Sequence, residues 1–396
     1  PDQSNGLEPG RGFIVYVFGD TNRDRNPEPF PYTLSANGLE SAVDLDLSGR
    51  LHPDPSGWSL LGNPFAAPVG SDEFTFGEGV DRTIYVWDNA QGAYLTHNGV
   101  SGSLTDGLIA PFQGFFVRNA ESGTRSLVLP VSAKRTQPEA APFRKATSAP
   151  SASRTAPDPA PRLILRASAP NPVPAHERPP NQPDTLRDAL HVTFTPDGRL
   201  GADPRDALKL FPLAADRPFL QLAGRVEPSH EQTESEAPAL LDIVNLPLEL
   251  SASDPPLEIF LQSAAFLPSA SGWRTATGAS TVRLEQSHTL PDHWIVEWVD
   301  RATGQRIDAR RHPERALPWR TEAAKPRHVD AEAVQAPLVA SAHLPAQTGW
   351  ALAIRAGASV STDGSGSGGT GYGGTGSGGS GSHGGSGTGF GSGADV

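Results

Sequence analysis

The strongest candidate for metal chemistry is a polar segment that begins at Asp20. Asp20, Asn22 and Asp24 place side-chain oxygens at alternate positions, as the opening of a calcium-binding loop does, so Ca²⁺ is the one cofactor that the sequence suggests. The pattern fails further on, because the sixth position is Arg25 instead of glycine and the twelfth is Pro31 instead of a bidentate glutamate. An ordinary polar hairpin loop is therefore the alternative interpretation.

Catalytic chemistry finds little support in the residue pattern. Acidic residues around Trp294 and Trp298 could suggest a glycosidase, which uses two carboxyl groups. Acidic residues on the solvent-exposed face of a strand are, however, far more common than catalytic pairs. These acids are Asp292, Glu297, Asp300, Asp308 and Glu314. The chain contains no His-Glu-x-x-His motif, no Gly-x-Ser-x-Gly elbow and no phosphate-binding loop. We therefore predict a protein without catalytic residues.

Short buried strands with tight turns are indicated by three apolar motifs, at residues 57–65, 84–88 and 111–117. Each motif sets aromatic and aliphatic residues between Gly, Pro or Asn, which is typical of strands that end in turns. Three more strands are predicted at residues 13–18, 43–47 and 126–129. Because no window shows sustained helical periodicity, we predict an N-terminal β-sandwich-like domain over residues 8–131.

The large aromatic side chains of these motifs decide between a structural and a binding role. Those predicted to fill the core are Trp58, Trp87, Phe112 and Phe115, since each brings a large apolar area. The alternative is an aromatic platform that stacks on sugar rings. Such a platform would consist of Trp58, Trp87 and Tyr94, provided that at least two of them are coplanar on one open face.

The rest of the chain divides by composition into a linker, a second domain and a tail. Residues 132–160 are rich in Pro, Ala and Ser and cannot bury enough apolar surface to fold, so we predict an extended linker. A second β-sandwich-like domain is predicted over residues 161–358, which makes the fold class all-β. Residues 359–396 form a low-complexity Gly/Ser-rich tail that we predict to be disordered, because it has almost nothing to pack.

Six strands are predicted in the second domain, at residues 162–166, 191–195, 257–261, 281–285, 294–299 and 351–355. In the first, second, fourth and last of these segments, apolar and polar residues alternate. Because successive side chains of a strand point to opposite faces, the alternation predicts that one face is buried and the other is exposed to solvent.

Charge and composition exclude several classes of partner. The net charge is −12 and the pI is near 5.4, whereas nucleic-acid binding needs a clustered basic surface, so we predict no nucleic-acid partner. No run approaches the roughly 18 apolar residues of a membrane span, so no span is predicted. The absence of cysteine removes disulfides and thiolate metal sites together.

The aromatic motifs resemble modules found in large surface proteins that Bacteroidota-type bacteria export by the type IX secretion route. The resemblance rests on residues 57–65, 85–88 and 111–117. It extends more loosely to residues 206–210 and 300–304, which are similar to recurring "DA-x-KL" and "D-x-x-TG" segments of the following β unit.

The resemblance implies an extracellular or cell-surface location, with the module between an adhesive or catalytic region and a C-terminal sorting domain. The sequence given ends at Val396 without that sorting domain. We therefore predict a non-catalytic structural or adhesion module, that is, a spacer or scaffold. The alternatives are a carbohydrate-binding module of a secreted hydrolase and a subunit of an extracellular filament. The corresponding partners would be cell-surface glycans or other copies of the chain.

Overall fold

The structure is a computed structural model, and it describes a defined subset of the chain. The described residues are 8–14, 39–89, 91–120, 122–135, 160–178, 182–201, 203–213, 217–226, 239–269, 272–286, 290–319, 325–327, 339–341 and 349–357. Within them the fold is all-β, as predicted, and every helix is a 3-10 turn of three residues. These turns are Ser48–Arg50, Ser71–Glu73, Thr105–Gly107, Val131–Ala133 and Ala175–Glu177.

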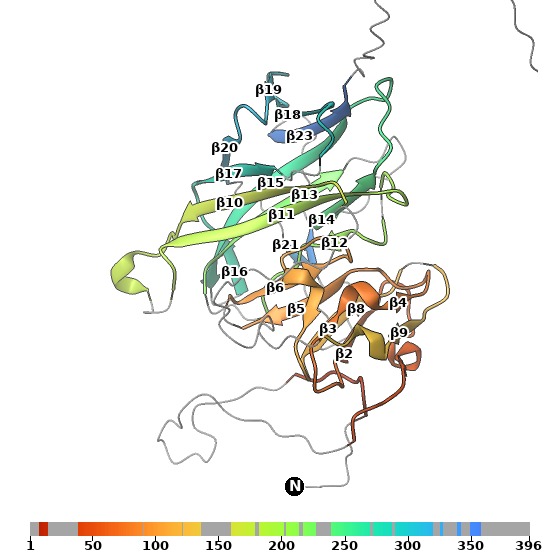
Figure 1. Ribbon diagram of the computed structural model, residues 1–396. Coiled ribbons are helices and arrows are strands. Elements are labelled where there is room, and N and C mark those ends of the chain that lie inside the picture. The colour runs from red at the N-terminus through yellow and green to blue at the C-terminus, as the bar shows by residue number, and fades with distance from the viewer. Residues whose placement is uncertain are drawn as a thin grey trace, which may run out of the picture. The chain divides into compact units, whose positions relative to one another are not determined.

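The N-terminal region, residues 8–135, consists of short strands in three small sheets (Figure 1). Its strands are β1 (Leu45–Asp46), β2 (Trp58–Gly62), β3 (Val69–Gly70), β4 (Thr75–Phe76), β5 (Ile84–Asp88), β6 (Ala93–His97), β7 (Leu108–Ile109), β8 (Gly114–Arg118) and β9 (Leu127–Leu129). The largest sheet has the order β2-β8-β5-β6, and the others are β1-β9-β4 and β3-β7. A buried apolar cluster that includes Phe65, Ile84 and Phe115 lies between them.

The second region, residues 160–357, is built on one twelve-stranded sheet. Its longer strands are β10 (Arg162–Pro170), β11 (Thr185–Thr195), β13 (Phe219–Val226), β14 (Leu241–Pro247), β15 (Leu257–Ser269), β17 (Ala279–Gln286), β18 (Trp294–Asp300) and β23 (Trp350–Ala356). The shorter ones are β12 (Ala207–Leu208), β16 (Gly272–Thr275), β19 (Arg306–Asp308) and β20 (Glu314–Pro318). Strands β21 (Lys325–Arg327) and β22 (Val339–Ser341) form a separate pair.

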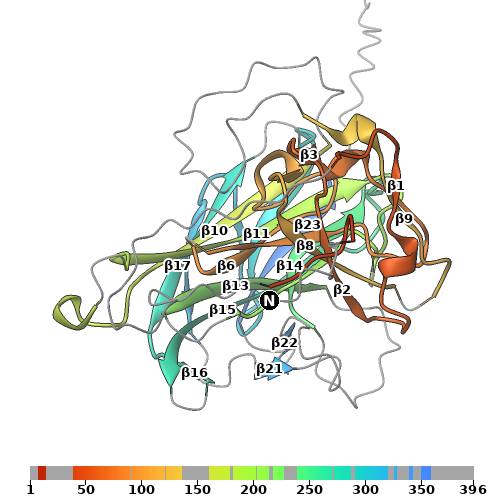
Figure 2. The ribbon, with the colours of Figure 1, turned by 90° about the horizontal axis from the view of Figure 1, so that it is seen from below.

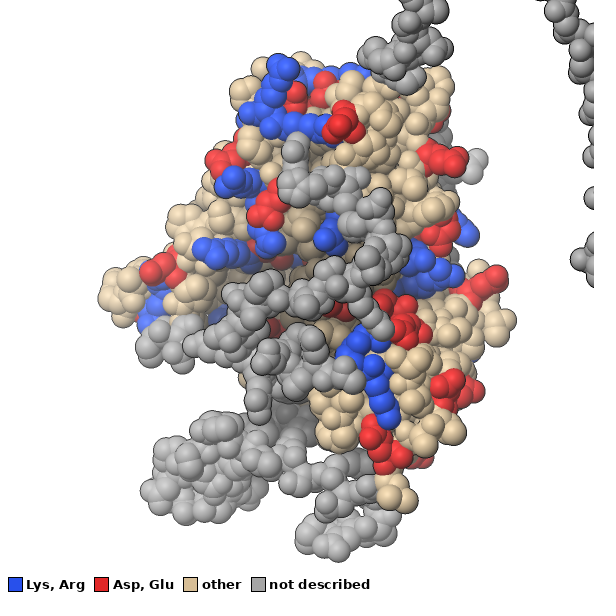
Figure 3. Space-filling model, in the orientation of Figure 1, with Lys and Arg blue, Asp and Glu red and all other residues tan. Residues whose placement is uncertain are grey.

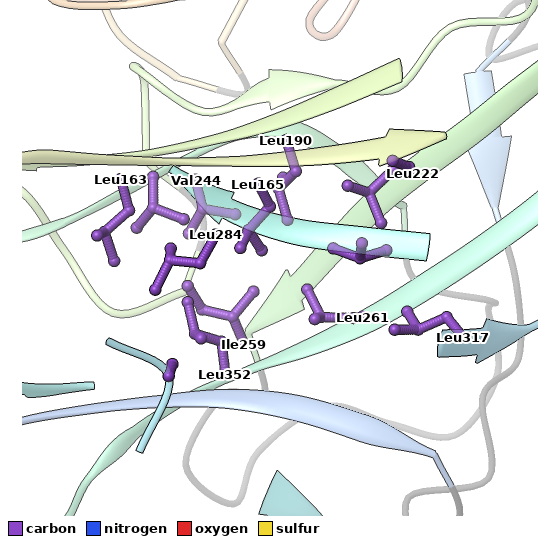
Figure 4. Packing of buried hydrophobic residues seen from close by; sticks show 14 of the residues in the cluster. Leu163, Leu165, Leu190, Leu222, Val244, Ile259, Leu261, Leu284, Leu317 and Leu352 are labelled. Carbon is purple, nitrogen blue, oxygen red and sulfur yellow. The ribbon is translucent and has the colours of Figure 1, made fainter. Parts of the chain in front are cut away.

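The large sheet has the order β19-β18-β23-β15-β13-β14-β11-β10-β17-β20, with β12 added to β14 and β16 to β15. The pairing of β11 with β14 is parallel, and the other pairings in this sheet are antiparallel. Figure 2 shows the sheet from below, where β10, β11, β13, β14, β15, β17 and β23 are labelled. Side chains from β10 and β11 meet those from β15 and β23 across a shared apolar core, as in a sandwich (Figure 4).

Most strands predicted from the sequence are confirmed, and their residues explain why. Those at 57–65, 84–88, 111–117 and 126–129 correspond to β2, β5, β8 and β9, and all six strands predicted in the second region are present. The strand predicted at 13–18 lies largely outside the described residues. Strands β13 and β14 were not predicted, because polar residues such as Asn245 interrupt their apolar pattern.

The predicted domain boundaries fall at residues 131 and 161, on either side of the predicted linker. The described residues of the two β regions group in one compact unit, because the two regions pack against each other. Of the predicted linker, only residues 132–135 and 160 are described, and the predicted disordered tail lies outside the described residues.

Two predictions about burial are wrong, and a third is met only in part, because Trp87 is half-buried and belongs to no buried apolar cluster. Phe112 is not a core residue: its side chain is 62% exposed, at a turn closed by the hydrogen bond from Gln113 N to Ala110 O. The polar face predicted to be wet on the strand at 191–195 is buried, with His191 at 5% exposure and Thr193 at 0%. The reason is that the N-terminal region covers this face, as described below.

Candidate functional site

The polar face of β11 forms the centre of a buried contact between the two regions. Val192 and Phe194 enter the apolar core of the second region, so the alternating His191 and Thr193 point the other way. There, His191 Nδ1 is 2.9 Å from the hydroxyl of Ser101 in the N-terminal region, with which it shares a hydrogen bond. Thr193 accepts a hydrogen bond of 3.2 Å from Asn98 of the N-terminal region.

A cluster of three charged groups, two of them buried and one half-buried, lies next to this contact. Lys209 Nζ is 2.6 Å from an oxygen of Asp188 and 2.6 Å from an oxygen of Asp242. The other oxygen of Asp242 accepts a 2.5 Å hydrogen bond from Thr96 of β6. Asp188 also accepts a 2.6 Å hydrogen bond from the backbone N–H of Leu222. We call Asp188, Lys209 and Asp242 the charged cluster.

The strands place these three groups together. Strand β12 pairs with β14, and the Lys209 N–H continues this pairing by donating a 2.7 Å hydrogen bond to Leu240 O. Lys209 therefore follows β12 at the level of Asp242, which lies on β14. Strand β11 runs along the other side of β14 and contributes Asp188.

Burial and mutual attraction set the charge state of the cluster. Burial raises the pKa of Asp188 to about 6, although the nearby Lys209 ammonium partly offsets that rise. Burial alone would lower the pKa of Lys209, but the two carboxylates outweigh it, so the Lys209 pKa lies above its ordinary value. The cluster therefore holds a cation firmly and can take up a proton to neutralise one of its two acids.

An apolar cluster adjoins the charged cluster and also draws from both regions. Its buried members are Trp58, Tyr85, Phe116, Ala207, Leu210 and Ile243. The Tyr85 hydroxyl accepts a 2.8 Å hydrogen bond from the backbone N–H of Leu208. The "DA-x-KL" segment at 206–210 therefore serves this contact. Its alanine and second leucine supply apolar area, and its lysine completes the charged cluster.

Three further groups, two buried histidines and Asp206, have shifted pKa values. Burial lowers the pKa of His191 to about 4 and that of His97 to about 4. Burial also raises the pKa of Asp206, which accepts hydrogen bonds from the backbone N–H groups of Asn245 and Asp203. The two histidines are thus neutral near pH 7, as suits His191, which hydrogen-bonds Ser101 across the contact, and His97, which hydrogen-bonds Ser71 within the N-terminal region.

The predicted calcium ligands lie outside the described part of the chain, whereas the three residues of the predicted aromatic platform lie within it. Asp20, Asn22 and Asp24 lie outside the described residues. Trp58 is only 5% exposed and packs edge-on against Tyr85 at an interplanar angle of 71°. Trp87 and Tyr94 are half-buried and meet at 68°, so they do not form a flat face for a sugar ring. The condition for a platform is not met by these three side chains.

Four of the five acidic residues considered for a glycosidase, Glu297, Asp300, Asp308 and Glu314, take part in ion pairs or turns. Glu297 lies 3.2 Å from Arg306, and Asp308 lies 3.4 Å from Arg311. Asp300 accepts a 2.9 Å hydrogen bond from Ala302 N, so the "D-x-x-TG" segment forms the turn between β18 and β19. Trp298 is fully buried and therefore offers no surface to a substrate.

A hollow of about 360 Å³ lies beside this turn, and its lining residues are Glu258, Val299, Arg301, Ala302, Gly304 and Arg306. Glu258 forms ion pairs with both Arg301 and Arg306. On the face shown in Figure 3, basic and acidic side chains are likewise interspersed instead of forming one patch of either sign.

Among the described residues, no group of three or more His, Cys, Asp or Glu side chains is arranged to hold a metal ion. No helix in the described part of the chain is long and apolar enough to cross a membrane.

The charged cluster has no direct signal in the amino-acid sequence. Asp188 and Asp242 lie in strands whose other residues are mostly apolar, and no sequence motif links either of them to Lys209. The available signal was a lysine between leucines, Leu208 and Leu210, because a lysine in an apolar segment has to find a buried counter-charge.

Comparison of the chain with protein-family models, with curated proteins and with solved structures found no match. The geometry of the contact between the two regions is therefore the basis for any functional conclusion.

Proposed function

We propose that this chain is a non-catalytic structural module, a spacer or scaffold with an adhesive role, of a secreted or cell-surface protein. The observation that carries the proposal is the contact between the two regions, in which an apolar cluster and a charged cluster lie side by side. Burial of apolar area favours any close docking, whereas buried polar groups favour only the docking that pairs them. A module held in one arrangement in this way is suited to keeping a fixed geometry between its neighbours.

The extracellular location rests on the resemblance of residues 57–65, 85–88 and 111–117 to modules exported by the type IX route. The structure supports a structural use of these motifs, since Trp58 and Phe115 are both buried in apolar clusters.

The proposal is tested by cutting the chain between the two regions. A protease site inserted after Lys145, within the predicted linker, separates residues 1–145 from 146–396 without altering any described residue. We expect the two fragments to co-elute in size-exclusion chromatography after cleavage, because the contact between the regions is buried. Fragments that separate at micromolar concentration would contradict a scaffold held together by this contact.

A matched pair of variants links that result to the charged cluster. Thr96→Val removes the hydroxyl that donates to Asp242 and keeps the shape of the side chain. Thr105→Val makes the same change at an exposed position. We expect the first variant to weaken the association of the cleaved fragments about tenfold, which corresponds to the roughly 1.5 kcal/mol of a hydrogen bond to a charged group. The second variant should leave it unchanged.

The adhesive role and its alternatives are separated by binding assays. Binding to a glycan array that is lost in Trp87→Ala would favour a carbohydrate-binding module. Assembly that rises with concentration and disappears on deletion of residues 361–396 would favour a filament subunit. Hydrolysis of a polysaccharide by the purified chain would refute the non-catalytic proposal.

A further inference from the structure

The charged cluster holds one amino group in direct contact with two carboxyl groups. Lys209 Nζ lies 2.6 Å from a carboxyl oxygen on either side, one from Asp188 and one from Asp242. The side chains of Lys209, Asp242 and Asp188 are 10%, 8% and 20% exposed, so water reaches the cluster only from the side of Asp188. Reacting atoms that are held in contact and aligned reach effective concentrations of about 10⁵–10⁸ M.

The two acids have different surroundings, which assign them different roles. The Asp188 oxygen next to Lys209 also accepts a 2.6 Å hydrogen bond from the Leu222 N–H, a donor that would stabilise negative charge on that oxygen. Asp242 is held at both oxygens, by Lys209 on one and by the Thr96 hydroxyl on the other. Asp188 is thus placed as the group attacked, and Asp242 as the group that transfers protons.

We propose that Lys209 and Asp188 become joined by an amide bond between Nζ and Cγ, with Asp242 transferring the protons, so that the chain carries an internal covalent cross-link. This inference goes beyond the scaffold role and does not depend on it. The bond would tie the segment that follows β12 to β11, on the side of the second region that faces the N-terminal region.

The reaction begins from the Lys209 ammonium, the protonated Asp188 acid and the Asp242 carboxylate. Asp242 takes one proton from the ammonium, and the free amine attacks Cγ of Asp188 to form a C–N bond. The hydroxyl of the tetrahedral centre then receives that proton from Asp242, its C–O bond breaks, and it leaves as water. Asp242 finally removes the excess proton from nitrogen. One amide, one water and one carboxylic acid result, so atoms and charge balance without an oxidant or a co-reactant.

Burial acts on these proton transfers in one direction and the neighbouring charges act in the other. Burial penalises every ionised group and so favours a neutral amine beside a neutral acid, whereas the two carboxylates raise the pKa of Lys209, so the free amine forms only transiently. The raised pKa of Asp188 keeps part of that acid protonated, as the attack requires.

Mass spectrometry of the purified full chain tests the proposal. Loss of one water lowers the intact mass by about 18 Da relative to the sequence. Trypsin then has to yield one species in which residues 188–199 are joined to residues 206–225, because cleavage at Lys209 is blocked once its side chain is an amide. An intact mass equal to that of the sequence, after prolonged incubation of the folded protein near neutral pH, would overturn the proposal.

Two variants provide the controls. Lys209→Arg keeps the positive charge but lacks the amine, so its mass should equal its own sequence mass. Asp242→Asn removes the proton-transfer group and should give folded protein without the linked peptide, with circular dichroism as the check on folding. An Asp-Gly pair such as Asp197 and Gly198 can also lose water by cyclisation. A loss that persists in Lys209→Arg would therefore have that other origin and would refute the cross-link.

Discussion

Replacement of His191 by glutamine should remove part of the acid sensitivity of the protein. His191 is buried and shares a hydrogen bond with Ser101, and its pKa is lowered from an ordinary 6.5 to about 4. Burial is the main cause, and the charges of Lys209, Arg166 and Arg162 act in the same direction, whereas Asp242 opposes them. Since the unfolded chain binds a proton more readily than the folded chain does, stability is fully present above the unfolded pKa and is lost as pH falls.

The size of the effect follows from the two pKa values. With an unfolded pKa of about 6.5 and a folded pKa of about 4, linkage removes about 2 kcal/mol of unfolding free energy at about pH 5 and about 3 kcal/mol at about pH 4. His97 contributes in the same direction, because its pKa is also lowered to about 4. Asp188 acts oppositely, since its raised pKa favours the folded state as pH falls from about 6 toward about 4. The total curve mixes these contributions, so the comparison with a variant isolates His191.

Urea denaturation of the wild type and His191→Gln between about pH 7 and about pH 4 provides the assay. We expect the unfolding free energy of His191→Gln, relative to that of the wild type, to rise by about 2–3 kcal/mol as pH falls from about 7 to about 4. Any loss of stability that the substitution causes near neutral pH does not affect this change. His176→Gln is the control, because its side chain is 80% exposed, and its curve should run parallel to that of the wild type. Parallel curves for wild type and His191→Gln would refute the buried, neutral histidine.

Three other substitutions test local features of the fold by the same denaturation assay. Phe112 is exposed with φ at +60°, a backbone conformation that costs a bulky residue about 1 kcal/mol or more. Phe112→Asn should therefore raise the free energy of unfolding by roughly 0.5–1 kcal/mol, and a lower value would contradict this explanation. Tyr85→Phe removes the acceptor of a backbone N–H of β12 and should cost about 1–2 kcal/mol; no change would mean that water replaces it. In Gly198→Ala, the added Cβ would lie 2.1 Å from a carbonyl oxygen of β14, so we expect the free energy of unfolding to fall by about 2 kcal/mol or more. Gly49→Ala is the control, because a Cβ there meets open space, and it should cost less than about 0.5 kcal/mol. Equal losses in the two variants would refute the close approach of Gly198 to β14.

The sequence predicted strands well because a strand leaves a local trace. On β11, the alternation of His191, Val192, Thr193 and Phe194 identified the strand and the side chains that enter the core. The same alternation could not show what lies against the polar face. A polar side chain is compatible with water and equally with a second polar surface, and here the surface is the N-terminal region around Ser101.

The charged cluster could not be predicted for a related reason. Asp188, Lys209 and Asp242 come from separate strand segments, and their distances depend on the order β13-β14-β11 and on the addition of β12 to β14. Strand order is a property of the whole sheet, which a local pattern does not contain. Phe112 shows the opposite failure, since an apolar motif predicted burial, whereas its position in a turn leaves the ring exposed.

The composition of the charged cluster explains how the two regions select one arrangement. A buried ion pair adds little net stability, because the cost of removing charges from water offsets their attraction. One lysine between two acids leaves an excess of negative charge, which the Thr96 hydroxyl and the Leu222 N–H partly balance by hydrogen bonds. Thr96 belongs to the other region, so a partner surface without a donor at that point would bury the Asp242 carboxylate with one oxygen unpaired. Leaving a buried carboxylate oxygen unpaired costs more free energy than the correct hydrogen bond gains. The cluster therefore mainly destabilises incorrect arrangements of the two regions.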